Sequence, residues 1–145
     1  MLEVESLLLA NHAEAHNGLL YMMGAGFTDV NQVIQDDQPG APPFHFGIGL
    51  TILVPWTETN RRHHVLLYME AEDGGEPLLR LEADMETGRP PGFTEGSDQR
   101  VVMAMAGEVT FPSPGGYRVA AELGSAPAKY ASFRVHHHRP LLRSA

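Results

Sequence analysis

The chain has 145 residues, no cysteine and a formal net charge of −8, from ten Lys and Arg against eighteen Asp and Glu. This length favours a single domain. The absence of cysteine excludes a disulfide framework, a thiolate zinc site and a cysteine nucleophile. The acidic balance argues against binding to nucleic acid or to an anionic membrane, because both require a basic surface.

We expect the protein to be cytoplasmic. Glu3 and Glu5 precede the first short apolar run, whereas a secretory signal begins with positive charge and has a longer apolar run. No stretch approaches the roughly 20 apolar residues that a membrane-spanning helix needs. A chain without cysteine also fits a reducing compartment.

A β-hairpin is the first predicted element. Asn17-Gly18 is the pair that a two-residue type I′ turn prefers, and it separates two apolar, strand-like runs at residues 7–16 and 19–27. In such a hairpin the small apolar residues share one face and the polar residues share the other. We expect the apolar face to point into the core; it comprises Ala13, Ala15, Leu20 and Met22.

A long alternating strand follows a polar connection. Residues 28–43 become rich in proline toward their end, which indicates a loop with room for one helical turn at its start. Residues 44–54 alternate with period two, and the even-numbered positions from Phe44 to Val54 are apolar. Gly47 and Gly49 lie on the opposite face, where they mark a bulge or the close approach of another segment.

The rest of the chain predicts short strands separated by turns, at residues 63–72, 77–86, 100–106, 117–123 and 129–136. Fifteen glycines and eleven prolines punctuate the sequence too often for long helices. We therefore predict an all-β fold, an antiparallel β-sandwich of eight or nine strands with immunoglobulin-like or jelly-roll connectivity. The single domain is expected over residues 1–136, with a C-terminal tail at 137–145.

Four short motifs occur in order along the chain: the hairpin sequence at residues 7–24, Val54-Pro-Trp-Thr-Glu-Thr-Asn-Arg-Arg-His63, Gly88-Arg-Pro-Pro-Gly92 and Pro114-Gly-Gly-Tyr117. Together they resemble an uncharacterised, mainly actinobacterial family, a domain of unknown function. The resemblance spans most of the chain, implies a compact β-sandwich and carries no catalytic residue. The chain departs from the family pattern at His12, His16 and Leu19, where aromatic, aliphatic and basic residues are expected.

His12, Glu14 and His16 are the candidate metal ligands. Residues two apart on a strand point the same way, so two imidazoles and a carboxylate would line one face. Consecutive side chains on that face stand nearly 7 Å apart, however, which makes it hard for one ion to reach all three. A solvated face beside a tight turn explains the same residues, and His45 would join them only if its strand lies alongside.

Trp56, Glu58, Arg62 and Arg89 are the candidate ligand-binding residues. The single tryptophan would act as a stacking platform at the rim of the sandwich, with Glu58 and Arg62 fixing a ligand. The simpler interpretation is a corner, where the indole covers the end of the core. Arg89 lies in a Pro-rich segment that is either a stiff recognition loop or a crossover between sheets.

No nucleophile motif, phosphate-binding loop or dinucleotide fingerprint is complete, so we expect a non-catalytic binding or interaction module with no cofactor. Its expected partner is a protein, and this could be a second copy of the chain; no nucleic acid, membrane or identifiable small ligand is expected. Two alternatives stay open. One is a metal- or small-ligand-binding barrel that uses the His12/Glu14/His16 face. The other is self-assembly through an exposed strand edge, either residues 129–135 or the opening hairpin.

Overall fold

The computed structural model describes residues 2–124 and 126–140 of the chain. The described residues form ten strands and a single 3-10 turn, and no other helix. The elements, in chain order, are β1 (Glu3–Ala10), β2 (His12–His16), β3 (Leu19–Met23), β4 (Asp29–Val33), β5 (Phe44–Val54), η1 (Trp56–Glu58), β6 (Arg62–Ala71), β7 (Leu79–Glu86), β8 (Gln99–Val109), β9 (Gly115–Leu123) and β10 (Lys129–His138).

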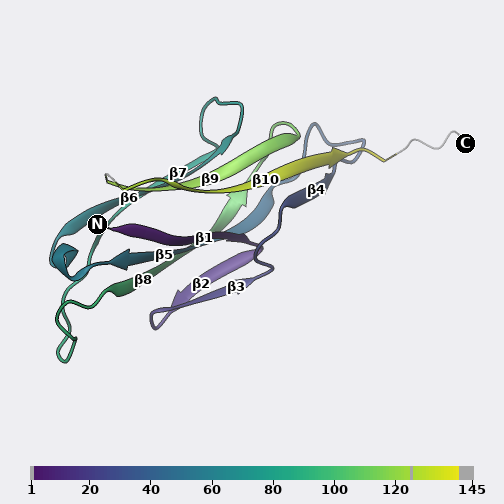
Figure 1. Ribbon diagram of the computed structural model, residues 1–145. Coiled ribbons are helices and arrows are strands. Elements are labelled where there is room, and N and C mark those ends of the chain that lie inside the picture. The colour runs from purple at the N-terminus through teal and green to yellow at the C-terminus, as the bar shows by residue number, and fades with distance from the viewer. Residues whose placement is uncertain (1, 125, 141–145) are drawn as a thin grey trace, which may run out of the picture.

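The strands are arranged in three layers, which Figure 1 shows one above the other. A five-stranded sheet has the order β4-β10-β9-β6-β7, and a three-stranded sheet has the order β1-β5-β8. The hairpin β2-β3 forms a separate third layer below the three-stranded sheet. Every pair of neighbouring strands is antiparallel except β4 and β10, which are parallel.

This strand order is immunoglobulin-like. Strands β1, β5 and β8 take the places of A, B and E, while β10, β9 and β6 take those of G, F and C, with β7 beside β6 as an additional C′ strand. A tyrosine corner occurs where that fold places it: Tyr117, near the start of β9, donates a 2.6 Å hydrogen bond to the carbonyl of Ser113. The predicted all-β sandwich with immunoglobulin-like connectivity is therefore confirmed, although it has ten strands instead of the eight or nine predicted and one parallel pair.

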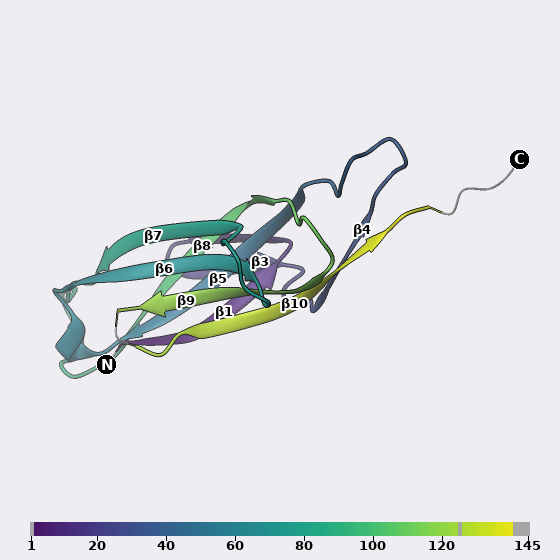
Figure 2. The same ribbon diagram turned by 90° about the horizontal axis from the view of Figure 1, so that it is seen from above.

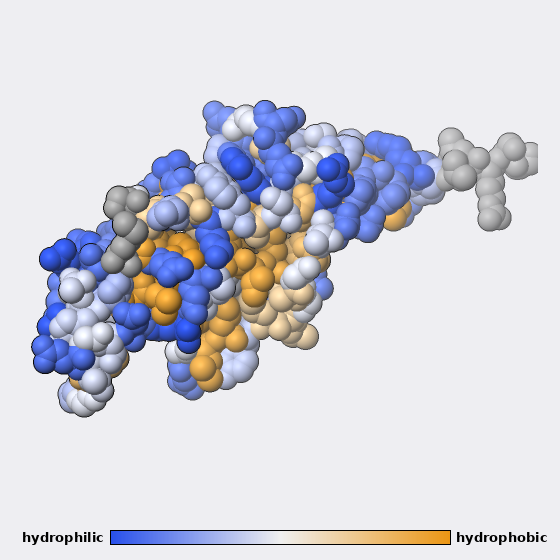
Figure 3. Space-filling model, in the orientation of Figure 1, coloured by the Kyte–Doolittle hydropathy of each residue, from blue (hydrophilic) through white to orange (hydrophobic). Residues whose placement is uncertain are grey.

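The core lies between the two larger sheets. The even-numbered residues of β5 are its centre, as their alternation predicted, and Phe46, Ile52 and Val54 have no exposed surface. Opposite them, Val65, Met69 and Val119 are buried from β6 and β9. Seen from the side where β1 and β10 lie, apolar residues run as a band across the middle of the molecule and hydrophilic residues occupy its ends (Figure 3).

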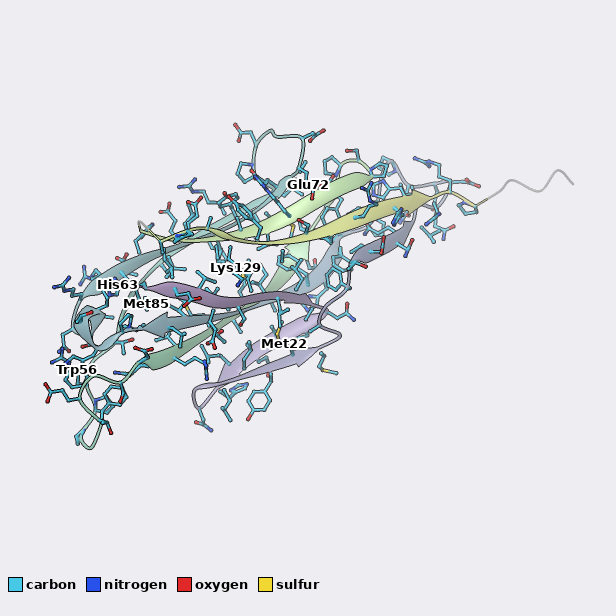
Figure 4. The ribbon with its side chains drawn as sticks, viewed as in Figure 1. Met22, Trp56, His63, Glu72, Met85 and Lys129 are labelled. Carbon is cyan, nitrogen blue, oxygen red and sulfur yellow. The ribbon has the colours of Figure 1, made fainter. Side chains whose placement is uncertain are left out.

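The predicted position of the first hairpin is wrong. Its apolar face packs against the outer surface of the three-stranded sheet and takes no part in the core between the sheets. Gly47 and Gly49 of β5 permit this, because a Cβ on Gly49 would stand 2.6 Å from Met22 Sδ and 2.8 Å from Leu20 Cδ2. Figure 4 shows Met22 on the side of the hairpin that faces the sheet. The two glycines therefore mark the close approach of another segment.

Two further expectations differ from the structure. Residues 29–33 form strand β4 where at most one helical turn was predicted, because β10 provides a parallel partner for them. That same pairing carries β10 through His138, so residues 137 and 138 belong to the sheet and not to a tail. Residues 141–145 of the expected tail lie outside the described residues.

Strand β10 is a free edge along only part of the predicted stretch, because β4 covers Arg134 and Val135 and leaves one side of residues 129–133 unpaired. It pairs with β9 over Lys129–Val135 and with β4 over Arg134–His138. The outermost strands of the larger sandwich sheet are β4 and β7, and those of the smaller are β1 and β8. Among the described residues, no helix has both the length and the apolar composition needed to cross a membrane.

Candidate functional site

The open side of the sandwich holds the main candidate site. Strands β7 and β8 end their respective sheets at the same side of the molecule, opposite the side of β1 and β10 (Figure 2). Between them lies an apolar groove with a volume of about 170 Å³. We call this the β7–β8 groove; its lining residues are Ile48, Leu50, Val65, Leu67, Leu81, Glu82, Ala83, Met103, Ala104 and Met105.

Inward-facing side chains remain partly exposed along this groove. Met103 and Met105 lie opposite the buried Leu50 and Ile48 of β5, and therefore point toward the core, yet both keep part of their surface accessible. Leu81 of β7 is 40% exposed although it pairs with the buried Leu67. These side chains lack cover because no described strand lies next to β8 on this side. The groove is thus an edge of the core that no described strand covers.

Trp56 and Arg89 contact each other in the structure. They do so as parts of a corner of the fold, which was the simpler interpretation of Trp56. The Arg89 guanidinium lies 3.9 Å from the centre of the indole, and Phe93 stacks on the indole at 5.8 Å. Arg89 Nε also donates to Thr59 Oγ1 at 2.7 Å, and Nη2 donates to the carbonyl of Trp56 at 3.0 Å. These bonds tie the segment after β7 to η1 and use two of the arginine's five N–H donors within the protein.

Glu58 and Arg62 lie apart from that corner. They line a polar hollow of about 440 Å³ at the end of the sandwich, which neither Trp56 nor Arg89 lines. His63 lines the same hollow and contacts the carbonyl oxygen of Glu58 at 2.8 Å. The Glu58 carboxylate lies 4.0 Å from His63 Nε2 and 3.9 Å from Arg61 Nη1. The four predicted ligand-binding residues therefore belong to two neighbouring places.

His12, Glu14 and His16 share the exposed face of the hairpin, as predicted. Glu14 bridges the two histidines, with His12 Nε2 3.0 Å from Oε1 and His16 Nε2 2.9 Å from Oε2. His45 does lie alongside, since its Nε2 is 3.3 Å from His12 Nδ1. Within residues 2–124 and 126–140, no group of three or more His, Cys, Asp or Glu side chains could hold a metal ion. The histidine nitrogens meet the carboxylate and each other instead.

These histidines make the stability of the folded hairpin depend on pH, and this dependence can be measured. Hydrogen bonds from His12, and then from His16, lower the pKa of Glu14 from its ordinary value of 4.5. A carboxyl whose folded pKa is depressed contributes stability above the unfolded pKa and loses it as the pH falls toward the folded value. We expect the melting temperature to fall between pH 5 and pH 3, and Glu14→Gln to make that fall shallower. Thermal unfolding followed by circular dichroism across this range measures both; equal slopes for the two proteins would contradict the expectation.

The histidines at the end of β10 are held by the sheet. His136 Nε2 lies 2.8 Å from Asp29 Oδ1 and His138 Nε2 lies 3.1 Å from Asn31 Oδ1, so both contact β4. The bond to His136, followed by the one to Thr28, lowers the pKa of Asp29. The parallel pairing of β4 and β10 therefore accounts for His136 and His138, whereas Nε2 of His137 is buried without a hydrogen-bond partner among the described residues.

Comparison with known proteins connects these features to a family. The model of a family of unknown function, DUF6941, matches residues 5–136. The chain belongs to this family. No curated protein matched. The DUF6941 match begins in β1 and ends in β10, so it includes the hairpin, the η1 corner and both strands of the β7–β8 groove.

Sequence reasoning missed the β7–β8 groove. It predicted strands at residues 77–86 and 100–106, but it could not place the two strands on the same open side. One signal was available. Residues 101–107 contain no charged residue and no proline, which is unusual for a strand that has a free edge.

Proposed function

We propose that this domain is a protein-interaction module that binds an extended polypeptide segment along the open side of its sandwich. One observation carries the proposal: no described strand lies beside β8 at the β7–β8 groove. In constant-type immunoglobulin domains, strand D occupies that position next to E. Here the segment between β7 and β8, residues 87–98, includes no strand.

The proposed binding mode is strand addition. The free edge of β8 offers a row of main-chain N–H and C=O groups, and main-chain hydrogen bonds supply much of the affinity in this mode. Alternate side chains of the bound segment would point into the β7–β8 groove. Its volume of about 170 Å³ suits one apolar side chain, since a cavity of about 150 Å³ binds benzene. Leu81, Met103 and Met105 would surround that anchor, and methionine adapts well to varied partners.

A labelled peptide tests the proposal. The probe is the sequence of residues 99–109 of this chain with a fluorophore at its N-terminus, and fluorescence anisotropy reports its binding as protein is added. We expect saturable binding, and we expect the same peptide with proline at the Ala104 position to lose it, because proline lacks the N–H donor. The mass of the protein is measured in the same samples, since pairing between copies would compete with the peptide.

A matched pair of protein variants locates the binding site. Leu81 is 40% exposed in the β7–β8 groove, whereas Leu8 is 44% exposed on β1, the edge strand of the three-stranded sheet that lies opposite β8. We expect Leu81→Glu to weaken peptide binding at least roughly fivefold, because it places a charge in an apolar pocket. Leu8→Glu should leave the affinity unchanged. Equal affinities for the two variants, or no binding to the wild-type protein at any concentration, would overturn the proposal.

Metal binding by His12, Glu14 and His16 is a second prediction, and it requires these side chains to rearrange, because no three described His, Asp or Glu side chains are positioned to hold an ion as they stand. It is supported by the three side chains sharing a face and by His45 standing next to His12. A calorimetric titration with Zn²⁺ tests it, with His12→Ala as the variant that should abolish the heat. Unchanged heat in the variant would exclude this site.

The proposed setting of the module is the bacterial cytoplasm. The chain has no cysteine, which suits a reducing compartment, and it resembles a mainly actinobacterial family. Fractionation of cells that produce the native protein, followed by immunodetection, tests the compartment.

A further inference from the structure

The free edge of β8 carries no charge and no proline over residues 101–107, and only the hairpin β2–β3 packs against the outer face of this strand among the described residues. β8 pairs with β5 along its whole length, and no described strand pairs with its other side. Residues 101–107 on this edge are Val-Val-Met-Ala-Met-Ala-Gly, without charge or proline. By contrast, β7 across the groove carries Arg80, Glu82, Asp84 and Glu86 on its outer face. Natural proteins place charges or proline on strand edges that stay free. We therefore expect another strand to cover the β8 edge.

The charges at the two ends of this edge are self-complementary. Arg100 and Glu108 flank the neutral stretch, and both share the outer face of the sheet with Ala104 because the three positions differ by even numbers. Arg100 and Glu108 are equally distant from Ala104 along the strand. If two copies of β8 pair in antiparallel fashion about a two-fold axis at Ala104, Arg100 of each copy stands directly opposite Glu108 of the other.

The same register places compatible side chains on the inner face. Met103 of one copy lies opposite Met105 of the other, over the β7–β8 groove where both are partly exposed. On the outer face, Ala104 meets Ala104 at the axis, so that small side chains face each other there. Between Arg100 and Glu108, the directly opposed positions thus carry either uncharged small or apolar residues or opposite charges, and apolar and opposite-charge pairs stabilise antiparallel strands.

Both charged side chains are accessible for such a contact. Glu108 is exposed, and its side chain makes no hydrogen bond or ion pair with any described residue. Arg100 is 57% exposed, and its Nε and Nη2 donate to the two carboxylate oxygens of Glu5, at 2.5 and 2.6 Å. Its guanidinium carries five N–H donors, so it can contact a second carboxylate without releasing Glu5.

We infer that a second copy of this chain covers the β8 edge, through antiparallel β8–β8 pairing about a two-fold axis at Ala104. The two three-stranded sheets then form one six-stranded sheet, in the isologous arrangement that most homodimers adopt. The inference rests on the proposed function, because it names the strand that fills the β7–β8 side. Strand β3 also has an uncharged edge, but it is only five residues long and has no charged pair that would align two copies.

Sedimentation equilibrium over a wide concentration range tests the inference. We expect the wild-type protein to form a dimer and Ala104→Lys to be monomeric, because the variant places two lysines opposite each other at the axis. Gln35→Lys is the matched control, since it adds the same charge at an exposed position outside the strands, and it should dimerise normally. Thermal unfolding of each variant confirms that it is folded.

A charge exchange tests the register itself. We expect Arg100→Glu and Glu108→Arg each to weaken the dimer roughly tenfold or more, because two ion pairs become two like-charge contacts. The double variant R100E/E108R should recover most of the affinity, since the opposed charges are again opposite in sign. Glu5→Gln is the control for the internal contact of Arg100, and it should leave the dimer intact.

The outcomes separate this inference from the proposed function. A wild-type protein that stays monomeric but binds the labelled peptide overturns the dimer and keeps the binding module. A dimer that is insensitive to Ala104→Lys, or one that the double exchange does not restore, also overturns the β8–β8 inference. A monomer that binds no peptide overturns both.

Discussion

Phe111→Ala is expected to lower the free energy of unfolding by about 3–5 kcal/mol, the range for truncating a buried aromatic side chain. Phe111 is 1% exposed and joins the two sheets at one end of the core. Its ring centre lies 4.9 Å from that of Tyr117, 5.7 Å from Phe133 and 5.9 Å from Phe44. The substitution therefore leaves a cavity among aromatic rings that the surrounding strands hold apart.

Urea denaturation measures this loss. A domain of this kind is stable by only about 5–15 kcal/mol, so Phe111→Ala should shift the midpoint strongly while the slope stays the same. Phe93→Ala is the matched control, because Phe93 is only half-buried and stacks on Trp56 outside the core. A loss at Phe111 no larger than that at Phe93 would show that the aromatic cluster does not join the sheets as described.

Gly47→Ala is expected to lift the β2–β3 hairpin from the sheet and to cost about 1–3 kcal/mol, the usual range for overpacking. The new Cβ would meet the backbone nitrogen of Ala13 and stand 2.6 Å from the carbonyl carbon of His12. Backbone atoms cannot rotate away as a side chain can, so β2 itself has to move. The 3.3 Å contact between His12 and His45 would be lost with it.

Hydrogen exchange distinguishes release of the hairpin from general instability. In Gly47→Ala we expect faster exchange of amides in residues 12–23, with exchange in β5, β6 and β9 almost unchanged. Gly107→Ala is the control on the neighbouring strand, because its Cβ would make only ordinary contacts, the nearest with Phe46 at 3.8 Å. It should be neutral or slightly stabilising, since alanine loses less backbone entropy than glycine. Unchanged exchange at residues 12–23 would contradict the close approach at Gly47.

The third layer accounts for the two glycines in an otherwise apolar strand. A hairpin of two strands has little stability by itself. Here it gains stability because Ala13, Leu20 and Met22 pack directly against the backbone of β5 at Gly47 and Gly49, where no side chain intervenes. Its other face keeps His12, Glu14 and His16 in solvent, where they contact one another. The position of the hairpin therefore decides which of its residues are free to act.

Local features of the sequence were sufficient for some strands and turns, but the strand predicted at residues 7–16 is divided between β1 and β2, which belong to different sheets. Residues 44–54 were predicted to the residue, because alternation over eleven positions admits only one arrangement with a buried face. Asn17 and Gly18 adopt φ values of 52° and 74°, as the predicted type I′ turn requires. Strand β4 was missed because residues 29–33 become a strand only through parallel pairing with β10, more than 100 residues later.

The sequence by itself determined the all-β class, the turns and the inner face of β5, because turn chemistry and period-two alternation act between neighbouring residues. Only the tertiary structure decided which apolar face enters the core and which strand edges stay open. The apolar face of β2–β3 and the even positions of β5 look alike as patterns, yet one packs outside the sheet and the other inside it. The β8 edge is likewise uncharged in the sequence, but it becomes a candidate interface because its sheet ends there and the apolar groove lies beside it.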